Sequence, residues 1–245
     1  MRNHLFVFTL VLIVPIAARA DCGLADLGTG AVTGVHDDAT LVLADGRELR
    51  LAAIEPAPRT TPLLRSLVEN RTLQLRSAGE PATDRYGRLV AFATTEAGSV
   101  QEALLGEGAA RVSARVGPIN CAQSLLNIEA DARRARRGLW NDPNFAPLPA
   151  EAGPRIQAEL GRFVLVEGGV VSVRQSGGRI YVNFGRDWTR DFSIVVPRRL
   201  QSGFRAAGRD LQGLAGRRIR VRGWLEQRAG PIIEATAPEQ IELLE

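Results

Sequence analysis

The stretch of residues 32–58 reads VTGVHDDATLVLADGRELRLAAIEPAP, and it decides the fold of the first half of the chain. Residues 40–43 and 48–54 are short apolar-rich runs bounded by turn residues, which favours strands. Asp45-Gly46 between them is typical of a tight hairpin turn. Residues 30–35 form a third such run, so the stretch predicts a three-stranded β-meander.

The residues that follow predict two more strands and three helices. Apolar residues at helical spacing predict helices over residues 62–69, 100–108 and 124–137, and two strands lie at 73–76 and 89–94. Residues 141–155 contain four prolines and no periodicity, which is typical of a linker. We therefore expect the first domain to span residues 21–140.

The second domain is predicted to span residues 156–245. Strand-like runs occupy residues 162–173, 179–184, 192–196, 217–226 and 232–234, with a short helix within 200–214. Five strands with a helix before the fourth predict a small barrel of the oligonucleotide/oligosaccharide-binding (OB) type. A sandwich has a similar strand count and stays open as an alternative. The expected fold class is mainly β with helices (α+β), with two small barrels.

The first domain resembles the staphylococcal nuclease (thermonuclease) family. The resemblance rests on the opening stretch together with DRYGRLVAF (84–92), VQEALLGEGAARV (100–112) and LLNIEADARRARRGLW (125–140), in that order. It implies a five-stranded barrel with added helices. It also implies calcium-dependent hydrolysis of the phosphodiesters of DNA and RNA.

The resemblance assigns roles to five residues. Arg50 and Arg88 match the two arginines that bind the phosphate, where cations stabilise charge on the phosphoryl oxygens. Tyr86 matches a tyrosine beside the bound nucleotide. Glu55 matches a carboxylate ligand of Ca²⁺, and Asp37 matches the first acid of the family's D-G-D-T turn. Together Glu55 and Asp37 predict at most a weak calcium site.

Other positions depart from the family pattern. Ala39 stands where the family has a second calcium-binding acid, and Pro58 stands where it has the glutamate that handles water. Ala114 and Val116 replace tyrosines that the family often has. Asp38 lies one residue from the lost ligand, but a slip of the turn toward it would flip every following side chain.

The predicted function follows from these matches and departures. Both arginines are kept and two acids are lost, so we expect a binding module for a phosphate- or nucleic-acid-type anion, with no hydrolysis. One alternative is an active metal-dependent nuclease that uses Glu55, an aspartate of the turn and both arginines. The other is a structural envelope protein, in which Arg50 and Arg88 only form ion pairs with Glu55 or Asp37.

The first twenty residues predict export. Arg2 precedes the 13-residue apolar stretch 5–17, and Ala18-Arg19-Ala20 is a typical cleavage site for a signal peptide. The mature chain is then expected to begin at Asp21 and to be periplasmic or secreted. The apolar stretch is short for an uncleaved anchor, and no later segment is long and apolar enough for a transmembrane helix.

Two cysteines in an exported chain favour a disulfide between Cys22 and Cys121. Two free buried thiols are the alternative. All 31 basic residues are arginine and only two histidines are present, His4 and His36. This composition excludes chemistry that needs a lysine, and it argues against zinc fingers and against a serine–histidine–aspartate triad.

Arginine is distributed unevenly between the two halves of the chain. Residues 21–150 have 14 Arg against 16 acids, whereas residues 151–245 have 15 Arg against 11 acids. Arginine alternates with other residues at Arg218, Arg220 and Arg222, so one face of that strand is basic. With the aromatic residues Tyr181, Phe184 and Trp188, this face is either a nucleic-acid groove or a solvated outer face. The basic run that ends the helix at residue 137 fits a solvated helix end.

Overall fold

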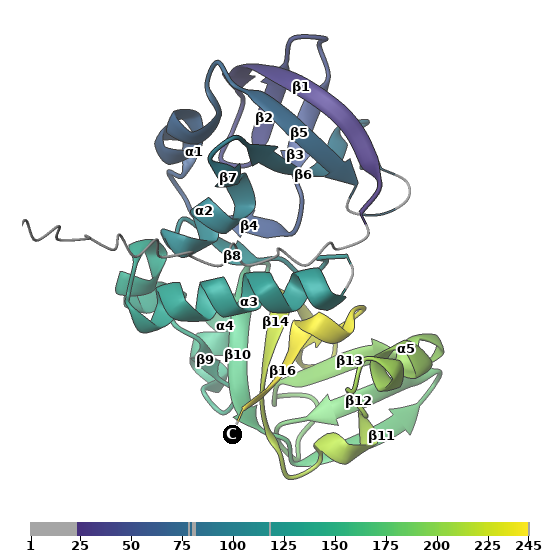
Figure 1. The fold of residues 1–245 in the computed structure, drawn as a ribbon. Helices are drawn as coiled ribbons and strands as arrows, with labels where there is room; N and C mark the ends of the chain where they lie inside the picture. Colours follow the sequence, from purple (N-terminus) through teal and green to yellow (C-terminus); the bar gives the residue numbers. More distant parts are fainter. Residues whose placement is uncertain (1–23, 78, 80–81, 118, 245) are drawn as a thin grey trace, which may run out of the picture.

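The computed structural model describes residues 24–77, 79, 82–117 and 119–244. The predicted signal peptide and Cys22 lie outside the described residues. Figure 1 shows a barrel formed by the first half of the chain and a second β-rich body formed by the second half. The helix α3 (Ile119–Arg134) runs between the two.

The first half folds into a closed five-stranded barrel. Its strands are β1 (Asp26–Val35), β2 (Thr40–Leu43), β3 (Glu48–Leu51), β5 (Thr72–Ser77) and β6 (Leu89–Thr95). Neighbouring strands pair in the order β3-β2-β1-β5-β6, and β3 closes the barrel by pairing in parallel with β6. The predicted turn at Asp45-Gly46 joins β2 to β3. The Gly46 backbone has a φ of 84°, a conformation that favours glycine at this position.

Two helices and three short strands complete the first barrel. They are β4 (Ile54–Pro56), α1 (Thr61–Val68), β7 (Gly98–Ser99), α2 (Val100–Gly106) and β8 (Ala110–Val112). Strand β4 pairs with β8, outside the barrel sheet. Leucine and alanine side chains from the strands, α1 and α2 pack together in one core, where Leu49, Leu73 and Leu104 are fully buried.

The second half has the same strand order as the first barrel when β10 and β11 are counted together as its first strand. Its main strands are β10 (Phe163–Gly169), β11 (Ser172–Ser176), β12 (Arg179–Asn183), β13 (Ser193–Pro197), β14 (Arg218–Gln227) and β15 (Pro231–Glu234). They pair in the order β11-β12-β13-β15-β14-β10, with β13 and β15 parallel.

The chain also connects the two ends of the path β11-β12-β13-β15-β14-β10. Strands β10 and β11 follow one another directly, and the chain changes partner between them. The Val170 amide donates to Arg217 before β14, and the Val171 amide donates to Asn183 on β12. The helix α5 (Gln201–Ala206) precedes the fourth strand, as expected for an OB-type barrel. The predicted α+β class is confirmed, with a closed barrel in the first half and further β-sheet structure in the second.

The predicted linker is more ordered than its composition implied. It contains parts of two 3₁₀ turns, η1 (Gly138–Asn141) and η2 (Pro143–Phe145), then β9 (Leu148–Pro149) and the start of α4 (Gly153–Ala158). Leu148 pairs with Val166 on β10 and is buried in the second core. The prolines therefore shape a packed connection, because proline is tolerated at short edge strands and at first helical turns.

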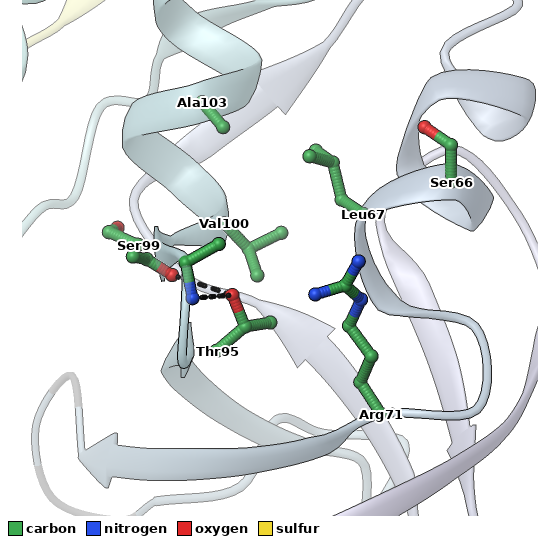
Figure 2. Close-up of a pocket in the computed structure, with 9 residues that line it drawn as sticks. Ser66, Leu67, Arg71, Thr95, Ser99, Val100 and Ala103 are labelled. Carbon is green, nitrogen blue, oxygen red and sulfur yellow. Dashed lines mark hydrogen bonds between the residues drawn. The ribbon is translucent and has the colours of Figure 1, made fainter.

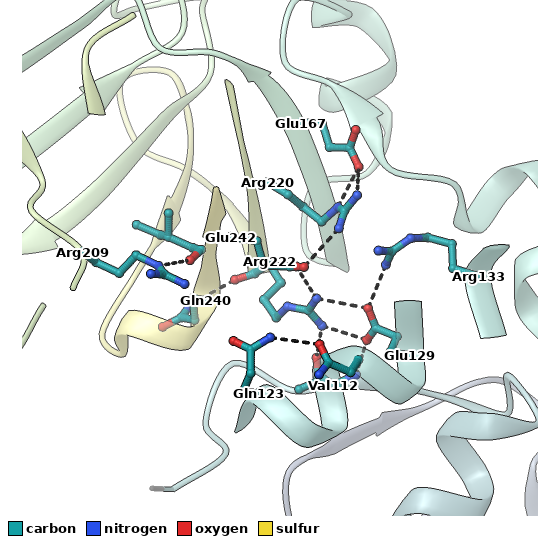
Figure 3. Close-up of polar contacts among 12 residues, drawn as sticks. Val112, Gln123, Glu129, Arg133, Glu167, Arg209, Arg220, Arg222, Gln240 and Glu242 are labelled. Carbon is teal, nitrogen blue, oxygen red and sulfur yellow. Dashed lines mark hydrogen bonds and ion pairs between the residues drawn. The ribbon is translucent and has the colours of Figure 1, made fainter. Parts of the chain in front are cut away.

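One buried arginine joins the two halves. Arg222 on β14 is fully buried, and its Nη1 and Nη2 donate to the two carboxylate oxygens of Glu129 on α3 at 2.8 and 3.1 Å. Nη1 also donates to the Val112 carbonyl at 3.1 Å, and Nη2 donates to Glu242 at 2.5 Å. Figure 3 shows this cluster, to which Arg133 adds a further bond to Glu129.

The cluster corrects the expectation for the alternating arginines of this strand. Arg220 pairs with Glu167 at 2.6 Å and with Glu242 at 3.1 Å, so these glutamates neutralise its charge next to Arg222. Only Arg218 of the three is exposed. Phe184 is buried in the second core as well. Both interpretations of this face, a nucleic-acid groove and a solvated outer face, were therefore wrong for Arg220 and Arg222. Their partners are Glu167 and Glu242 on the neighbouring strands β10 and β16 (Ile241–Leu244), and Glu129 on α3.

Charge in this cluster makes stability depend on pH. Burial acts to raise the pKa of Glu242, but Arg222 and Arg220 hold that pKa below its ordinary value. A carboxyl with a lowered pKa in the folded state stabilises the protein above its unfolded pKa. That stabilisation is lost as the pH falls through the folded pKa.

We predict that Arg222→Ala lowers the free energy of unfolding by about 3–5 kcal/mol, because the fully buried Glu129 loses its bidentate partner and keeps only Arg133 as a counter-charge. Arg218→Ala on the same strand is the matched control and should change it by less than about 0.5 kcal/mol. Urea unfolding at neutral pH measures both. Equal losses in the two variants would contradict the role assigned to Arg222.

Candidate functional site

A groove of about 440 Å³ lies where the first barrel meets the second half of the chain. The first barrel contributes Arg50, Glu55, Pro56, Pro58 and Arg111 to its lining. The opposite wall includes Phe145, Arg162, Phe163 and Trp224. The groove is thus built from both halves, and the position of one against the other sets its width.

Arg50 reaches this groove from β3. Its backbone pairs with Thr40 on β2 and with Val90 on β6, so the residue lies at the closure of the barrel. The side chain is half-buried, and within the described residues it makes no hydrogen bond and no ion pair within 4.0 Å. Its charge acts on two carboxylates, those of Asp37 and Glu55. Arg50 is therefore a positive group with unused donors.

Glu55 is the residue that the family resemblance matches to a carboxylate ligand of Ca²⁺. It lies on β4, directly opposite Arg111 on β8. Burial raises the pKa of Glu55 above its ordinary value, against the opposing effect of Arg50 and Arg111. Desolvation therefore outweighs two nearby positive charges at this carboxyl.

The two aspartates of the predicted turn hold local structure. Asp37 accepts from the Ala39 amide at 2.8 Å and, with its other oxygen, from the Thr40 hydroxyl at 3.0 Å. Burial acts to raise the pKa of Asp37, but these bonds and the charge of Arg50 lower it overall. Asp38 accepts from the amide and the hydroxyl of Thr61 at 2.6 Å each, which caps the start of α1. Neither aspartate lines the groove.

The two positions that depart from the family pattern differ in their surroundings. Ala39 is fully buried, so a methyl group rather than a carboxylate occupies this position in the interior. Pro58 is exposed and lines the groove. Within the part of the chain that the structure describes, no group of three histidine, cysteine or acidic side chains is placed to hold a metal ion.

Arg88 and Tyr86 lie beside the groove rather than in its lining. Arg88 pairs with Asp84 at 2.7 Å, and its Nη1 donates to the Thr40 hydroxyl at 3.5 Å. Tyr86 is 67% exposed, and the guanidinium carbons of Arg85 and Arg88 lie 4.7 and 5.3 Å from its ring centre. Arg88 thus reaches Thr40, whose backbone pairs with that of Arg50 on the neighbouring strand.

Sequence reasoning missed Arg111. Its Nη1 donates to the Phe163 carbonyl at 2.7 Å, and its guanidinium lies 5.5 and 5.1 Å from the rings of Phe145 and Phe163. Burial lowers the pKa of Arg111, and Glu55 counters this effect. Alternation within residues 110–112 was the only signal in the sequence, because the rings around Arg111 come from the second half of the chain.

A second hollow in the first barrel is lined by none of the predicted site residues. It lies between α1 and the start of α2 and has a volume of about 90 Å³. Figure 2 shows Arg71 reaching its rim, with Thr95 and Ser99 on the facing side.

The fold and groove define the class of the first half as an OB-type barrel with a basic groove at its edge. Residues 57–142 match the family described as staphylococcal nuclease homologue. The first half is therefore a staphylococcal nuclease-like domain, as the sequence predicted. The match includes Tyr86 and Arg88, whereas Asp37, Arg50 and Glu55 precede it. In the described residues, no helix is both long and apolar enough to span a membrane.

Proposed function

We propose that this protein is an exported module of the thermonuclease family that binds a phosphate-type anion at Arg50 without hydrolysing it. The single observation that carries the proposal is that the Arg50 side chain lies in a groove without a partner among the described residues. Its guanidinium is half-buried in a groove and lacks any hydrogen-bond partner among the described residues. A guanidinium presents paired donors that match two oxygens of a phosphate.

The donor set argues against calcium-dependent hydrolysis. Ca²⁺ takes six to eight oxygen ligands, several of them charged. Of the available acids, Asp37 and Asp38 already accept bonds from Ala39, Thr40 and Thr61. Glu55 and Glu159 both line the groove, but Glu159 pairs with Arg162 at 3.1 Å. Glu55 is then the one groove acid without such a pair among the described residues, which does not fit a calcium site. Pro58 has no group that accepts a proton, so this chain lacks a base at that position.

The remaining residues have roles in binding. Arg50 donates to the anion, and Arg88 with Tyr86 extends the positive surface around Thr40. Arg111 donates through Nη1 to the Phe163 carbonyl, while its buried Nε has no hydrogen-bond partner in the described structure, and its charge counters that of Glu55. Glu55 opposes the anion when it is ionised, and the raised pKa of this carboxyl reduces that opposition.

Export of the mature chain from Asp21 is part of the proposal, and it places both cysteines in an oxidising compartment. We expect Cys22 and Cys121 to form a disulfide, so thiol titration of the denatured protein should find no free thiol before reduction and two after it. Reduction should lower the free energy of unfolding by about 2–5 kcal/mol. Two reactive thiols before reduction would contradict the pairing.

The absence of hydrolysis has a direct test. The mature protein is incubated with single-stranded and duplex DNA, with Ca²⁺ or with a chelator, next to Arg88→Ala as a background control. We expect no cleavage above that control. Calcium-dependent cleavage that Arg88→Ala abolishes would establish the alternative of an active nuclease.

Anion binding is tested with inorganic phosphate by calorimetry. Arg50→Ala should weaken binding about 10- to 150-fold, the range for losing hydrogen bonds to a charged group. Arg65→Ala, at an exposed surface ion pair with Glu69, is the matched control and should leave the affinity unchanged. An unchanged affinity in Arg50→Ala would favour the alternative of a structural protein.

The raised pKa of Glu55 predicts a pH dependence. We expect Glu55→Gln to bind sulfate more tightly than the wild type at neutral pH, because an ionised carboxylate no longer repels the anion. As the pH falls through the raised pKa, Glu55 takes up a proton and the wild type should approach the variant. Titrations with sulfate, whose charge is constant over this range, measure the difference. Weaker binding by Glu55→Gln would show that the carboxylate acts as a ligand.

A further inference from the structure

The second barrel carries its own groove, which is the larger of the two at about 850 Å³. It runs over β11, β12 and β13 and is bordered by the loop before β13 and the loop between β14 and β15. Four arginines and two aromatic residues are prominent in its lining: Arg174, Arg179, Arg186, Arg228, Tyr181 and Trp188.

The charge of this groove is not neutralised from within. No aspartate or glutamate is among the residues that line it. In the described structure, Arg174, Arg179 and Arg186 make no hydrogen bond and no ion pair through their side chains. Arg228 differs, because it pairs with Glu234 at 2.6 Å. Three unpaired arginines in one concave surface attract an anionic ligand.

An aromatic side chain stands exposed in the same groove. Trp188 is 67% exposed, whereas Phe184 and Phe192 at the two ends of its loop are buried against each other. Tyr181 lies half-buried on β12 and also lines the groove. Exposed aromatic faces next to arginines are the surface on which nucleic-acid bases stack.

The loop that carries Trp188 is fixed in place. Asp187 accepts from the amide and the hydroxyl of Thr189 at 3.0 and 2.5 Å, and Asp191 accepts from the Asp187 amide at 2.9 Å. The loop also packs closely on Gly230, where an added Cβ would lie 2.6 Å from the Trp188 carbonyl oxygen. A rigid platform loses little conformational entropy when a ligand binds.

We propose that this groove binds single-stranded nucleic acid, with Trp188 and Tyr181 stacking on bases and Arg174, Arg179 and Arg186 contacting phosphates. A ligand with both bases and phosphates accounts for the presence of both aromatic residues and arginines in the lining. An acidic peptide without aromatic residues would use only the arginines. An acidic polysaccharide could also pack a sugar ring on Trp188, so heparin is the comparison that separates it from a nucleic acid. A duplex keeps its bases stacked on each other and does not offer them.

This site is separate from the anion site at Arg50, and neither depends on the other. The groove at Arg50 is lined by β3, β4 and β8 with residues 144–148, 159–165 and Trp224, none of which lines the second groove. Variants of the two grooves therefore distinguish the failure of this inference from the failure of the proposed function.

The test uses fluorescence anisotropy of labelled single strands of about 12 nucleotides, within the range covered by one OB-type barrel. Oligo-dT and oligo-rU serve as separate DNA and RNA arms for the mature protein. Trp188→Ala should weaken binding about 5- to 150-fold, the range for losing one stacked base, while Trp188→Phe should retain most of the affinity. Arg174→Ala with Arg179→Ala should weaken binding and flatten its dependence on salt.

Arg218→Ala is the matched control, because Arg218 is an exposed arginine of the same barrel that does not line the groove. It should bind as the wild type does. Trp188 is mostly exposed, so its variants should keep the wild-type unfolding midpoint, and this is checked in urea.

Three outcomes would overturn the inference. One is the absence of binding to either strand, and another is binding that Trp188→Ala leaves unchanged. The third is binding lost in Arg50→Ala but kept in the Trp188 and Arg174/Arg179 variants, which would assign the nucleic acid to the first barrel. Heparin and polyglutamate are tested in parallel. If they bind as tightly as the strands and Trp188→Ala has no effect on them or on the strands, the groove holds acidic polymers in general.

Discussion

The bidentate pair of Arg222 with Glu129 is the contact on which the arrangement of the two halves depends. Both side chains are fully buried, and each has left water for a partner in the other half of the chain. Burying two charges costs several kcal/mol per ion, which only good geometry and further hydrogen bonds offset. Arg222 finds these at Val112 and Glu242, so only one relative position of the barrels satisfies the cluster. Apolar packing alone is less selective, because it is not directional.

The groove at Arg50 is a consequence of that position. Its first wall is the edge of the first barrel, and its second wall follows β10 and Trp224, which lies two residues after Arg222 on the same strand. Arg111 ties the two walls together through the Phe163 carbonyl. A change that loosens the Arg222 cluster therefore also widens the groove. The anion binding that we propose at Arg50 would in this way depend on residues that do not touch the anion.

Local patterns were enough to predict the first barrel. The turn at Asp45-Gly46 and the ordered family segments depend on neighbours in sequence. Of the predicted site residues, the structure places Arg50 and Glu55 in one groove, whereas Asp37, Tyr86 and Arg88 do not line it. The roles of Arg220 and Arg222 were beyond such reasoning, because a basic strand face looks the same whether it meets water, nucleic acid or a buried glutamate. Arg222 and Glu129 are 93 residues apart, and no local pattern records that they meet. Arg111 was missed for the same reason.

Two groups of arginines in the second half differ in whether glutamates neutralise their charge. Arg220 and Arg222 are neutralised by glutamates in a buried cluster, so they fix the structure and add no field at the surface. Arg174, Arg179 and Arg186 have no such partners and share a groove with Trp188. Like charges held close together repel one another, and an unpaired set lowers the stability of the folded state. A bound anion removes that repulsion, so the set that costs stability in the free protein is the one that gains most from a ligand. The positions of the glutamates, rather than the number of arginines, decide which arginines are available to bind.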